Sequence, residues 1–218
     1  MAFWAIACVM PRRALSRDES KAITRQRLLD GAARLLGEVG YGGLSTSAVA
    51  RAAGVAQPTF YVHFRDMDDL VRSLGTERIG ALRAQLRAAR EDLLAGRGVD
   101  AVRETFRVSV QTWIENPGLF RLYAQEMQHP TSPMGKMARE LRAELHTDLV
   151  QDLIRLGFPS TTKAERERVH MVAEAMIAQT EALARGHLDG TYKNIDTVVD
   201  VLTRFAVGVL TLEGRLAP

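Results

Sequence analysis

A short stretch of the sequence combines side chains that can hydrogen-bond to base edges with side chains that can reach phosphate oxygens. Gln57 can form two hydrogen bonds with an adenine edge, and Thr59 can contact a thymine methyl or a hydrogen-bonding edge. Tyr61 and His63 can bond phosphate oxygens, which fixes the register on a duplex without distinguishing its sequence. The four side chains therefore suit the surface of a nucleic acid.

Two short helices joined at a glycine would hold these side chains in place. Ser45 is a good N-cap for the first helix, and Gly54 stands where a tight turn needs a residue without a Cβ atom. The second helix is predicted over residues 57–64, with Phe60 and Phe64 four residues apart and facing inward together. The pattern predicts a helix-turn-helix whose second helix can enter a major groove. A packed helical corner with an exposed polar face is the alternative.

The chain has 218 residues and a formal net charge of only +3, but this charge is uneven. Residues 11–65 contain nine Lys and Arg against four Asp and Glu, which leaves a net charge of −2 for residues 66–218. A basic beginning on a near-neutral body favours a nucleic-acid partner. The hydrophobic content of 46% excludes wholesale disorder. The single cysteine excludes an internal disulfide and is typical of a protein of the reducing cytoplasm.

Apolar residues recur at steps of three and four along most of the chain, which predicts an all-α fold. Residues 1–20 are expected to form a flexible leader and basic arm, residues 21–66 a three-helix DNA-binding domain, and residues 67–218 a helical bundle. Glycines and prolines place the later helices, and Asn116 is expected to cap the one that begins at Pro117. The predicted ranges in the bundle are about 67–95, 99–115, 134–156, 162–185 and 194–212. No apolar run is long enough to cross a membrane.

The helix-turn-helix residues resemble those of a known protein family. Residues 49–55, Val-Ala-Arg-Ala-Ala-Gly-Val, and residues 57–64, Gln-Pro-Thr-Phe-Tyr-Val-His-Phe, are similar to the signature of the TetR family of bacterial transcriptional repressors. The resemblance covers about residues 24–70. It implies base contacts by Gln57, Pro58 and Thr59. It implies phosphate contacts by Thr46, Tyr61 and His63.

The chain departs from the family pattern at two positions. Family members often carry a basic residue where this chain has Ser47, and a lysine where it has Met67. Ser47 remains a candidate for DNA contact. The absence of both cations affects the expected strength of DNA binding and the expected base preference. Other basic side chains near the motif are candidates to compensate. They are Arg65, Lys21, Arg25, Arg12, Arg13 and Arg17.

A narrower resemblance concerns regulators of fatty-acid synthesis and desaturation. It rests on residues 60–70, Phe-Tyr-Val-His-Phe-Arg-Asp-Met-Asp-Asp-Leu, and residues 116–122, Asn-Pro-Gly-Leu-Phe-Arg-Leu. It implies that a long-chain acyl thioester such as acyl-CoA controls DNA binding. The alternative is a TetR-like regulator of efflux or catabolism that responds to another small apolar ligand.

Several aromatic and methionine residues of the bundle are candidates to line an internal cavity, and filling of an ordinary core is the alternative for each. They are Phe106, Trp113, Phe120, Tyr123, Met127, Met137 and Met171. The histidines at positions 129, 146 and 170 lack the spacing of a helical metal site, so neither a metal nor a cofactor is predicted.

The last two helices carry apolar stripes that predict a homodimer interface, with burial inside one subunit as the alternative. The candidate interface residues are Ile177, Thr180, Leu202, Phe205 and Val209. A two-fold dimer would present two recognition helices to successive major grooves, so a roughly palindromic operator is expected. The sequence contains no nucleophile elbow and no phosphate-binding loop, which argues against an enzyme. A structural helical protein that does not bind DNA is the remaining alternative.

Overall fold

The computed structural model describes residues 16–96, 98–129 and 131–213, and these residues form helices without any strand. The prediction of an all-α fold is confirmed. The predicted leader, with Arg12 and Arg13, lies almost wholly outside the described residues. The elements are α1 (Arg17–Val39), η1 (Tyr41–Gly43), α2 (Thr46–Ala52), α3 (Gln57–His63), α4 (Met67–Leu94), α5 (Gly98–Glu115), α6 (Pro117–Glu126), α7 (Pro133–Arg155), α8 (Lys163–Leu188) and α9 (Ile195–Leu212).

Capping residues explain where most of these helices begin. The side chain of Ser45 accepts a hydrogen bond from the backbone three residues later, as predicted for α2, and the side chain of Thr162 does the same at the start of α8. The first helix starts earlier than predicted, because Ser16 and Glu19 form a capping box in which each side chain bonds the other's backbone N–H. The last four residues of the predicted flexible arm are therefore helical.

Asn116 does not cap α6, which corrects the prediction. Its side-chain amide instead donates to the carbonyl of Thr112, 2.9 Å away, at the end of α5. Pro117 begins α6, a position that requires no backbone N–H. Asn116 therefore terminates one helix by satisfying its last carbonyls instead of starting the next.

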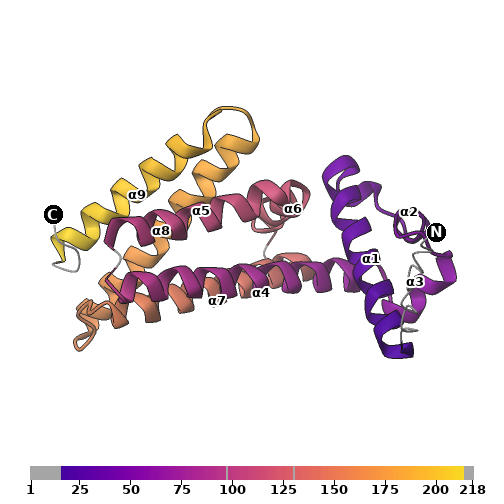
Figure 1. Ribbon diagram of the computed structural model, residues 1–218, viewed down its shortest axis with the longest axis horizontal. Helices are drawn as coiled ribbons and strands as arrows, with labels where there is room; N and C mark the ends of the chain where they lie inside the picture. Colours follow the sequence, from indigo (N-terminus) through magenta and orange to yellow (C-terminus); the bar gives the residue numbers. More distant parts are fainter. Residues whose placement is uncertain (1–15, 97, 130, 214–218) are drawn as a thin grey trace, which may run out of the picture.

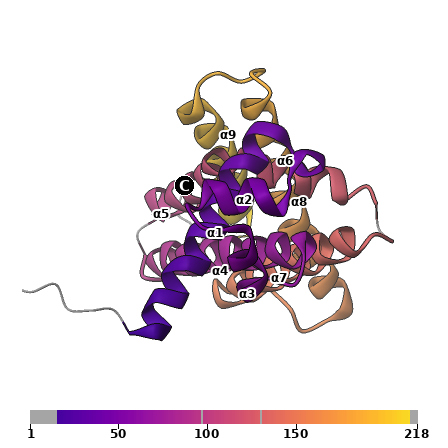
Figure 2. The same ribbon diagram turned by 90° about the vertical axis from the view of Figure 1, so that its right-hand side faces the viewer.

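The helices form a small unit at one end of an elongated molecule and a bundle over the rest (Figure 1). The small unit consists of α1, α2 and α3, and the view along the long axis places α2 and α3 on its outer surface (Figure 2). The long helix α4 leaves this unit and runs through the bundle beside α7. Helices α5, α8 and α9 pack on the other side, and α6 lies against α1.

Two clusters of buried apolar side chains hold the molecule together. The N-terminal core is built from α1, α2, α3 and the start of α4, and includes Phe60 and Leu70. The bundle core is built from α4, α5, α7, α8 and α9. Helix α6 contributes to both, because Leu119 and Leu122 belong to the N-terminal core whereas Phe120 belongs to the bundle core. The N-terminal core thus extends beyond residue 66, the predicted boundary between the domains.

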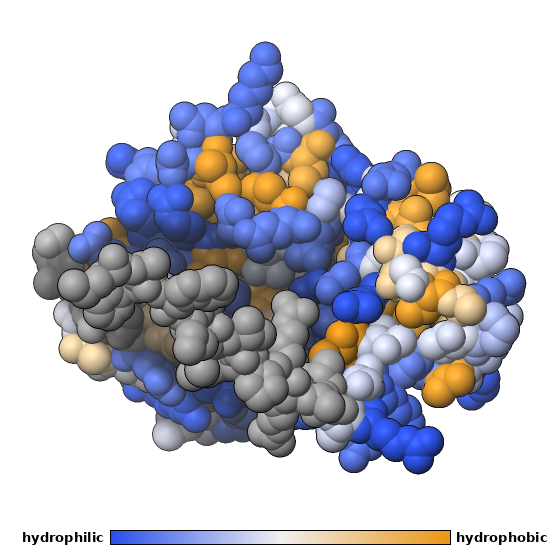
Figure 3. Space-filling model, turned by 45° about the vertical axis from the view of Figure 1, so that its right-hand side comes forward, coloured by the Kyte–Doolittle hydropathy of each residue, from blue (hydrophilic) through white to orange (hydrophobic). Residues whose placement is uncertain are grey.

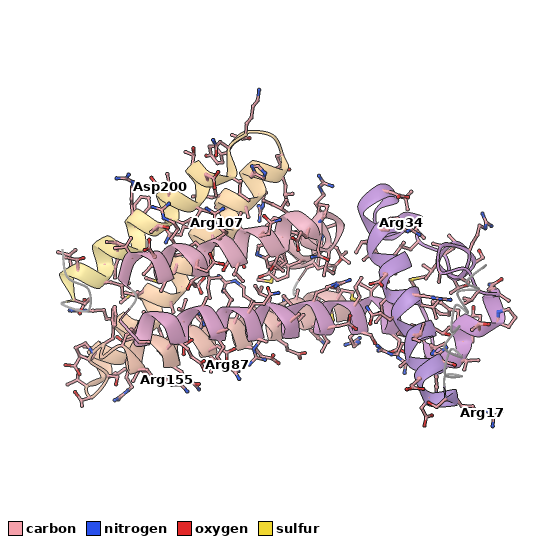
Figure 4. All side chains as sticks on the ribbon, in the orientation of Figure 1. Arg17, Arg34, Arg87, Arg107, Arg155 and Asp200 are labelled. Atoms are coloured by element: carbon pink, nitrogen blue, oxygen red, sulfur yellow. The ribbon has the colours of Figure 1, made fainter. Side chains whose placement is uncertain are left out.

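Ion pairs reinforce the contact between α5 and α9. Arg103 bonds Asp200 at 3.0 Å, and Arg107 bonds Asp196 at 3.0 Å. Arg107 and Asp200 lie along the seam between the two helices (Figure 4). None of the described helices is long and apolar enough to span a membrane.

Candidate nucleic-acid interface and internal cavities

The turn between α2 and α3 depends on a glycine with a positive φ angle. Gly54 has φ +70°, a conformation that residues with a Cβ atom rarely adopt. The N–H of Val55 then returns to the carbonyl of Ala50 at 3.0 Å, which closes the end of α2. Arg34 of α1 donates to the carbonyl of Ala52 at 3.1 Å, so α1 braces the same corner. The predicted helix-turn-helix is confirmed in its geometry.

Helix α3 turns its two phenylalanines inward and a mixed polar and apolar face outward. Phe60 and Phe64 are at most 2% exposed, and Phe60 is fully enclosed in the N-terminal core. The opposite face presents the exposed side chains of Gln57, Pro58, Tyr61 and Val62. Thr59 and His63 are half-buried at the flanks, so they stand further from the centre of this face than predicted.

Val62 is a candidate contact residue that the sequence analysis missed. Its side chain is 64% exposed although it is apolar, and it lies beside Tyr61 on the outer face of α3. Counting four residues on from Pro58 would have placed it there. Its methyl groups suit contact with a thymine methyl in the major groove. Hydrophobic patches of this kind interrupt the largely hydrophilic surface of the molecule (Figure 3).

Contacts between polar side chains connect the start of α2 to α3. The amide of Gln57 donates to the hydroxyl oxygen of Thr46 at 3.0 Å, and the hydroxyl groups of Thr46 and Tyr61 are 3.4 Å apart. The exposed hydroxyl of Ser47 lies 3.3 Å from that of Ser45. These contacts bring Thr46, Gln57 and Tyr61 together, so a single duplex can meet all three. To bond a base, the Gln57 amide must either break its hydrogen bond to Thr46 or donate its second N–H.

Basic side chains from α1 surround the inner end of α3. Burial, together with the charges of Lys21 and Arg25, lowers the pKa of His63, so its ring is neutral at pH 7. The buried Nδ1 of His63 has no hydrogen-bond partner among the described residues. The guanidinium of Arg25 lies 5.0 Å from the centre of the Phe64 ring. Arg17 stands at the outer end of α1 and points away from the bundle (Figure 4).

The two residues that follow the motif are partly committed to contacts within the chain. The guanidinium of Arg65 lies 3.0 Å from Asp66 but remains 80% exposed, so it is still accessible to a phosphate. Met67, which stands where family members carry a lysine, is half-buried against the N-terminal core. Its apolar side chain therefore has a packing role at the start of α4.

The bundle contains a cavity of about 100 Å³, called here the larger cavity, whose lining is mostly apolar. Two of the predicted cavity residues, Phe106 and Trp113, line it. Its polar wall includes Arg90 and Asp152, which form a buried ion pair at 2.7 Å, and Glu181. It lies beside α4, α5, α7, α8 and α9, so movement of its walls affects most of the bundle.

A smaller cavity of about 30 Å³ lies between α4, α6 and α7, nearer to the DNA-binding unit. Trp113, Tyr123 and Met137 line it, in agreement with their predicted cavity role. The hydroxyl of Tyr123 donates to Glu181 at 2.7 Å, and burial, together with this carboxylate, raises the pKa of Tyr123.

Three predicted cavity residues lie elsewhere. Phe120 is buried behind Trp113, with ring centres 4.7 Å apart, and lines neither of the two cavities. Met127 is half-buried at the end of α6, outside both. Met171 is 65% exposed on the outer face of α8, because the turn of the helix directs it away from the bundle core.

The outer surfaces of α8 and α9 form an apolar groove, called here the α8–α9 face. It is lined by residues of both helices, including Met171, Phe205 and Val209, and Phe205 is 63% exposed. Two predicted interface residues are not on it. Leu202 is fully buried in the bundle core, and Thr180 is 8% exposed with its hydroxyl bonded to the carbonyl of Met176.

Ile177 is half-buried and lines the larger cavity, and it is not among the residues that line the α8–α9 face. The apolar residues of α8 and α9 thus divide between an inner and an outer face of each helix. No cluster of three or more potential metal ligands occurs in the part of the chain that the structure describes.

Comparison with known proteins agrees with this architecture. Residues 28–74 match the family of bacterial regulatory proteins described as the tetR family. The structure is similar to that of the fatty acid degradation regulator FadR from Bacillus halodurans, with a TM-score of 0.68 and 16% identity over 84% of this chain and 97% of that one. At such identity the likeness shows the fold alone.

Two further structures have the same fold with a small molecule bound. The repressor FadR from Thermus thermophilus, in complex with lauroyl-CoA, has a TM-score of 0.57 and 19% identity over 89% of this chain and 96% of that one. The regulator LfrR from Mycobacterium smegmatis, in complex with proflavine, has a TM-score of 0.61 and 18% identity over 84% of this chain and 94% of that one.

Proposed function

Because residues 28–74 match the tetR family of bacterial regulatory proteins, we propose that this chain is a ligand-responsive repressor that binds a palindromic operator as a homodimer. The observation that carries the proposal is the outer face of α3, where Gln57 and Tyr61 are exposed and joined to Thr46 of α2. In this arrangement Gln57 and Val62 contact bases, while Thr46, Tyr61 and Ser47 contact phosphates. Pro58, Thr59, His63 and Arg65 are candidates for contacts at the edges of this interface.

The α8–α9 face supports the proposed homodimer. Exposed apolar side chains such as Phe205 and Met171 gather on one surface of these two helices, which is the surface opposite the bundle core. A contiguous exposed apolar surface is typical of a protein interface. A palindromic operator requires that the two-fold axis through this face places the two copies of α3 on one side of the dimer.

A long-chain acyl thioester is the proposed ligand. The larger cavity is apolar apart from Arg90, Asp152, Glu181 and a few hydroxyl groups, which suits a long apolar chain with a polar head. The lauroyl-CoA bound to the Thermus protein is an acyl thioester of this kind. Ligand binding inside the bundle would shift α4 or α6, and both helices also contact the DNA-binding unit.

A cationic aromatic ligand is the second candidate. The larger cavity combines Trp113, which can stack on a flat ring, with the carboxylates of Asp152 and Glu181. These carboxylates pair with Arg90 and Arg142, so a cationic ligand would have to displace one of these arginines. Proflavine, bound to the Mycobacterium protein, is a ligand of this second kind. Under this alternative the regulator would respond to a small molecule unrelated to lipids.

A gel-shift experiment tests the proposal. DNA fragments that flank the gene are incubated with the protein over a tenfold excess of random duplex, and the retained fragment is mapped by footprinting. Specific retention of one fragment with a two-fold symmetric footprint is expected. Acyl-CoA and proflavine are then added separately, and release of the fragment identifies the ligand class. Equal retention of every fragment at low salt would refute operator recognition.

A further inference from the structure

The two cavities of the bundle share one wall, the indole ring of Trp113. The larger cavity follows α4 from Leu82 to Arg90, and the smaller cavity lies beside Gly75 and Met137. Trp113 lines both and is only 6% exposed, so its ring stands between two apolar spaces and not at the protein surface.

We infer that the two cavities are successive parts of one channel for a linear acyl chain, with Trp113 as the gate between them. A short chain occupies the larger cavity only, which widens to hold it. A chain long enough to pass Trp113 enters the smaller cavity and weakens operator binding. The inference rests on the proposed function, because it specifies which acyl thioesters act through the same bundle.

The dimensions and polarity of the channel fit such a ligand. Arg90 and Asp152 provide a polar end, and the Nε atom of Arg90 is buried without a hydrogen-bond partner among the described residues, so it can donate to a ligand oxygen. Along α4 the distance from Arg90 to Gly75 is about 22 Å at the rise of an α-helix. The smaller cavity has an almost wholly apolar lining, which suits the end of the chain and not its head.

Occupation of the smaller cavity has a direct path to the DNA-binding unit. Leu119 and Leu122 of α6 line this cavity and also belong to the N-terminal core. Trp113 packs against the Phe120 and Tyr123 rings of the same helix, with centres 4.7 Å and 5.4 Å away. A chain that displaces Trp113 therefore pushes on α6, whereas a chain confined to the larger cavity touches neither leucine.

The size of the cavities explains why binding must change the structure. Volumes of about 100 Å³ and about 30 Å³ are small beside an acyl chain, since a cavity of roughly 150 Å³ holds a single benzene. Met137 forms part of the wall of the smaller cavity, and its unbranched side chain can move aside. A long chain thus favours a form of the bundle that differs from the one described here, which is the condition for coupling to DNA.

The experiment measures operator affinity by fluorescence anisotropy in the presence of octanoyl-, lauroyl- and palmitoyl-CoA. Binding of each ligand is measured separately by the emission of Trp113 in a Trp4→Phe background, which leaves this indole as the sole tryptophan. We expect octanoyl-CoA to bind and to change operator affinity less than about twofold. We expect palmitoyl-CoA to weaken it more than about tenfold, within the usual range of allosteric coupling.

Gly75→Ala and a matched control test the role of the smaller cavity apart from that of the rest of the bundle. A Cβ atom at Gly75 would lie 3.5 Å from Met137 and 3.7 Å from Leu141, so the methyl group fits and occupies part of the smaller cavity. Gly80→Ala on the same helix meets nothing within 4 Å and is the control. The larger Gly75→Val provides a second, more complete block.

The outcomes distinguish this inference from the proposed function. We expect both Gly75 variants to reduce the effect of palmitoyl-CoA on operator affinity, while octanoyl-CoA binding and the Gly80→Ala control stay unchanged. If octanoyl- and palmitoyl-CoA release the operator equally, or if the Gly75 variants respond as the wild type does, the gate is refuted and the acyl-responsive repressor stands. If no acyl-CoA binds, the ligand class proposed above is wrong and the gate falls with it.

Discussion

Replacement of Gly118 by alanine tests the contact through which α6 meets α1. A Cβ atom at this position would lie less than 3.0 Å from backbone atoms of Leu36 and Gly37. These backbone atoms belong to the last turn of α1 and cannot move aside as a flexible side chain can, so α1 and α6 must separate. Overpacking of this kind costs about 1–3 kcal/mol of unfolding free energy.

The helix propensity of alanine opposes this cost. Alanine is favoured over glycine by about 1 kcal/mol in the interior of a helix, and by less near an end. Because Gly118 is the second residue of α6, the overpacking term prevails and a net destabilisation of roughly 1–2 kcal/mol remains. For a chain of this size, that corresponds to a decrease in Tm of about 2–8 °C.

Gly80→Ala is the matched control, because a Cβ atom at Gly80 meets nothing within 4 Å on the exposed side of α4. It should raise the free energy of unfolding by up to about 1 kcal/mol. Thermal and urea unfolding are followed by circular dichroism at one fixed protein concentration, because dimerisation makes Tm depend on concentration. A Gly118→Ala variant that is as stable as Gly80→Ala would refute the close approach of α1 and α6.

Three further predictions concern DNA binding and assembly. Gln57→Ala should weaken operator binding by about 1–3 kcal/mol and relax the base preference at one position per half-site; equal losses on operator and random duplex in a gel shift would contradict base recognition. Phe205→Glu should place a charge in the apolar α8–α9 face and yield monomers in analytical ultracentrifugation. The control Ile154→Glu, at an exposed apolar residue of α7, should remain dimeric; a dimeric Phe205→Glu would move the interface elsewhere. Because folding lowers the pKa of His63, its contribution to the free energy of unfolding is complete above the unfolded pKa of about 6.5 and is lost as the pH falls through the native pKa. In urea titrations at a series of pH values, His63→Gln should remove this loss of stability at low pH. If the variant loses stability as the wild type does, His63 is solvated in the native protein.

The DNA-binding unit could be predicted from sequence because its determinants are local. Ser45 caps α2, Gly54 permits the turn, and Phe60 and Phe64 share a face through simple helical spacing. Each of these features operates over a few residues and depends little on the rest of the molecule. The half-buried position of Thr59 could not be predicted in this way, because it depends on how α3 packs against the other helices.

The faces of α8 and α9 could not be predicted in the same way, because these helices carry apolar residues on two sides. Leu202 and Phe205 are three residues apart, a spacing that assigns both to one stripe, yet Leu202 is fully buried and Phe205 is 63% exposed. Periodicity shows that a helix has an apolar stripe but does not say what covers it. The same limit applies to Trp113, whose place between two cavities results from the packing of α4, α6 and α7 around it.

Helix α6 contributes to both the N-terminal core and the bundle core, and this has a consequence for the construction of hybrid regulators. A chimera that joins the first 66 residues of this chain to the bundle of a relative would place a foreign α6 against α1 and into the N-terminal core. The relative's residues would then replace Leu119 and Leu122, while the apolar residues of this chain that pack against these leucines would stay. Gly118 would also be replaced in any relative that carries another residue at this position. The portable unit is therefore discontinuous in sequence, and a hybrid that retains α6 together with α1 to α3 should both fold and respond to ligand more faithfully than one divided at the start of α4.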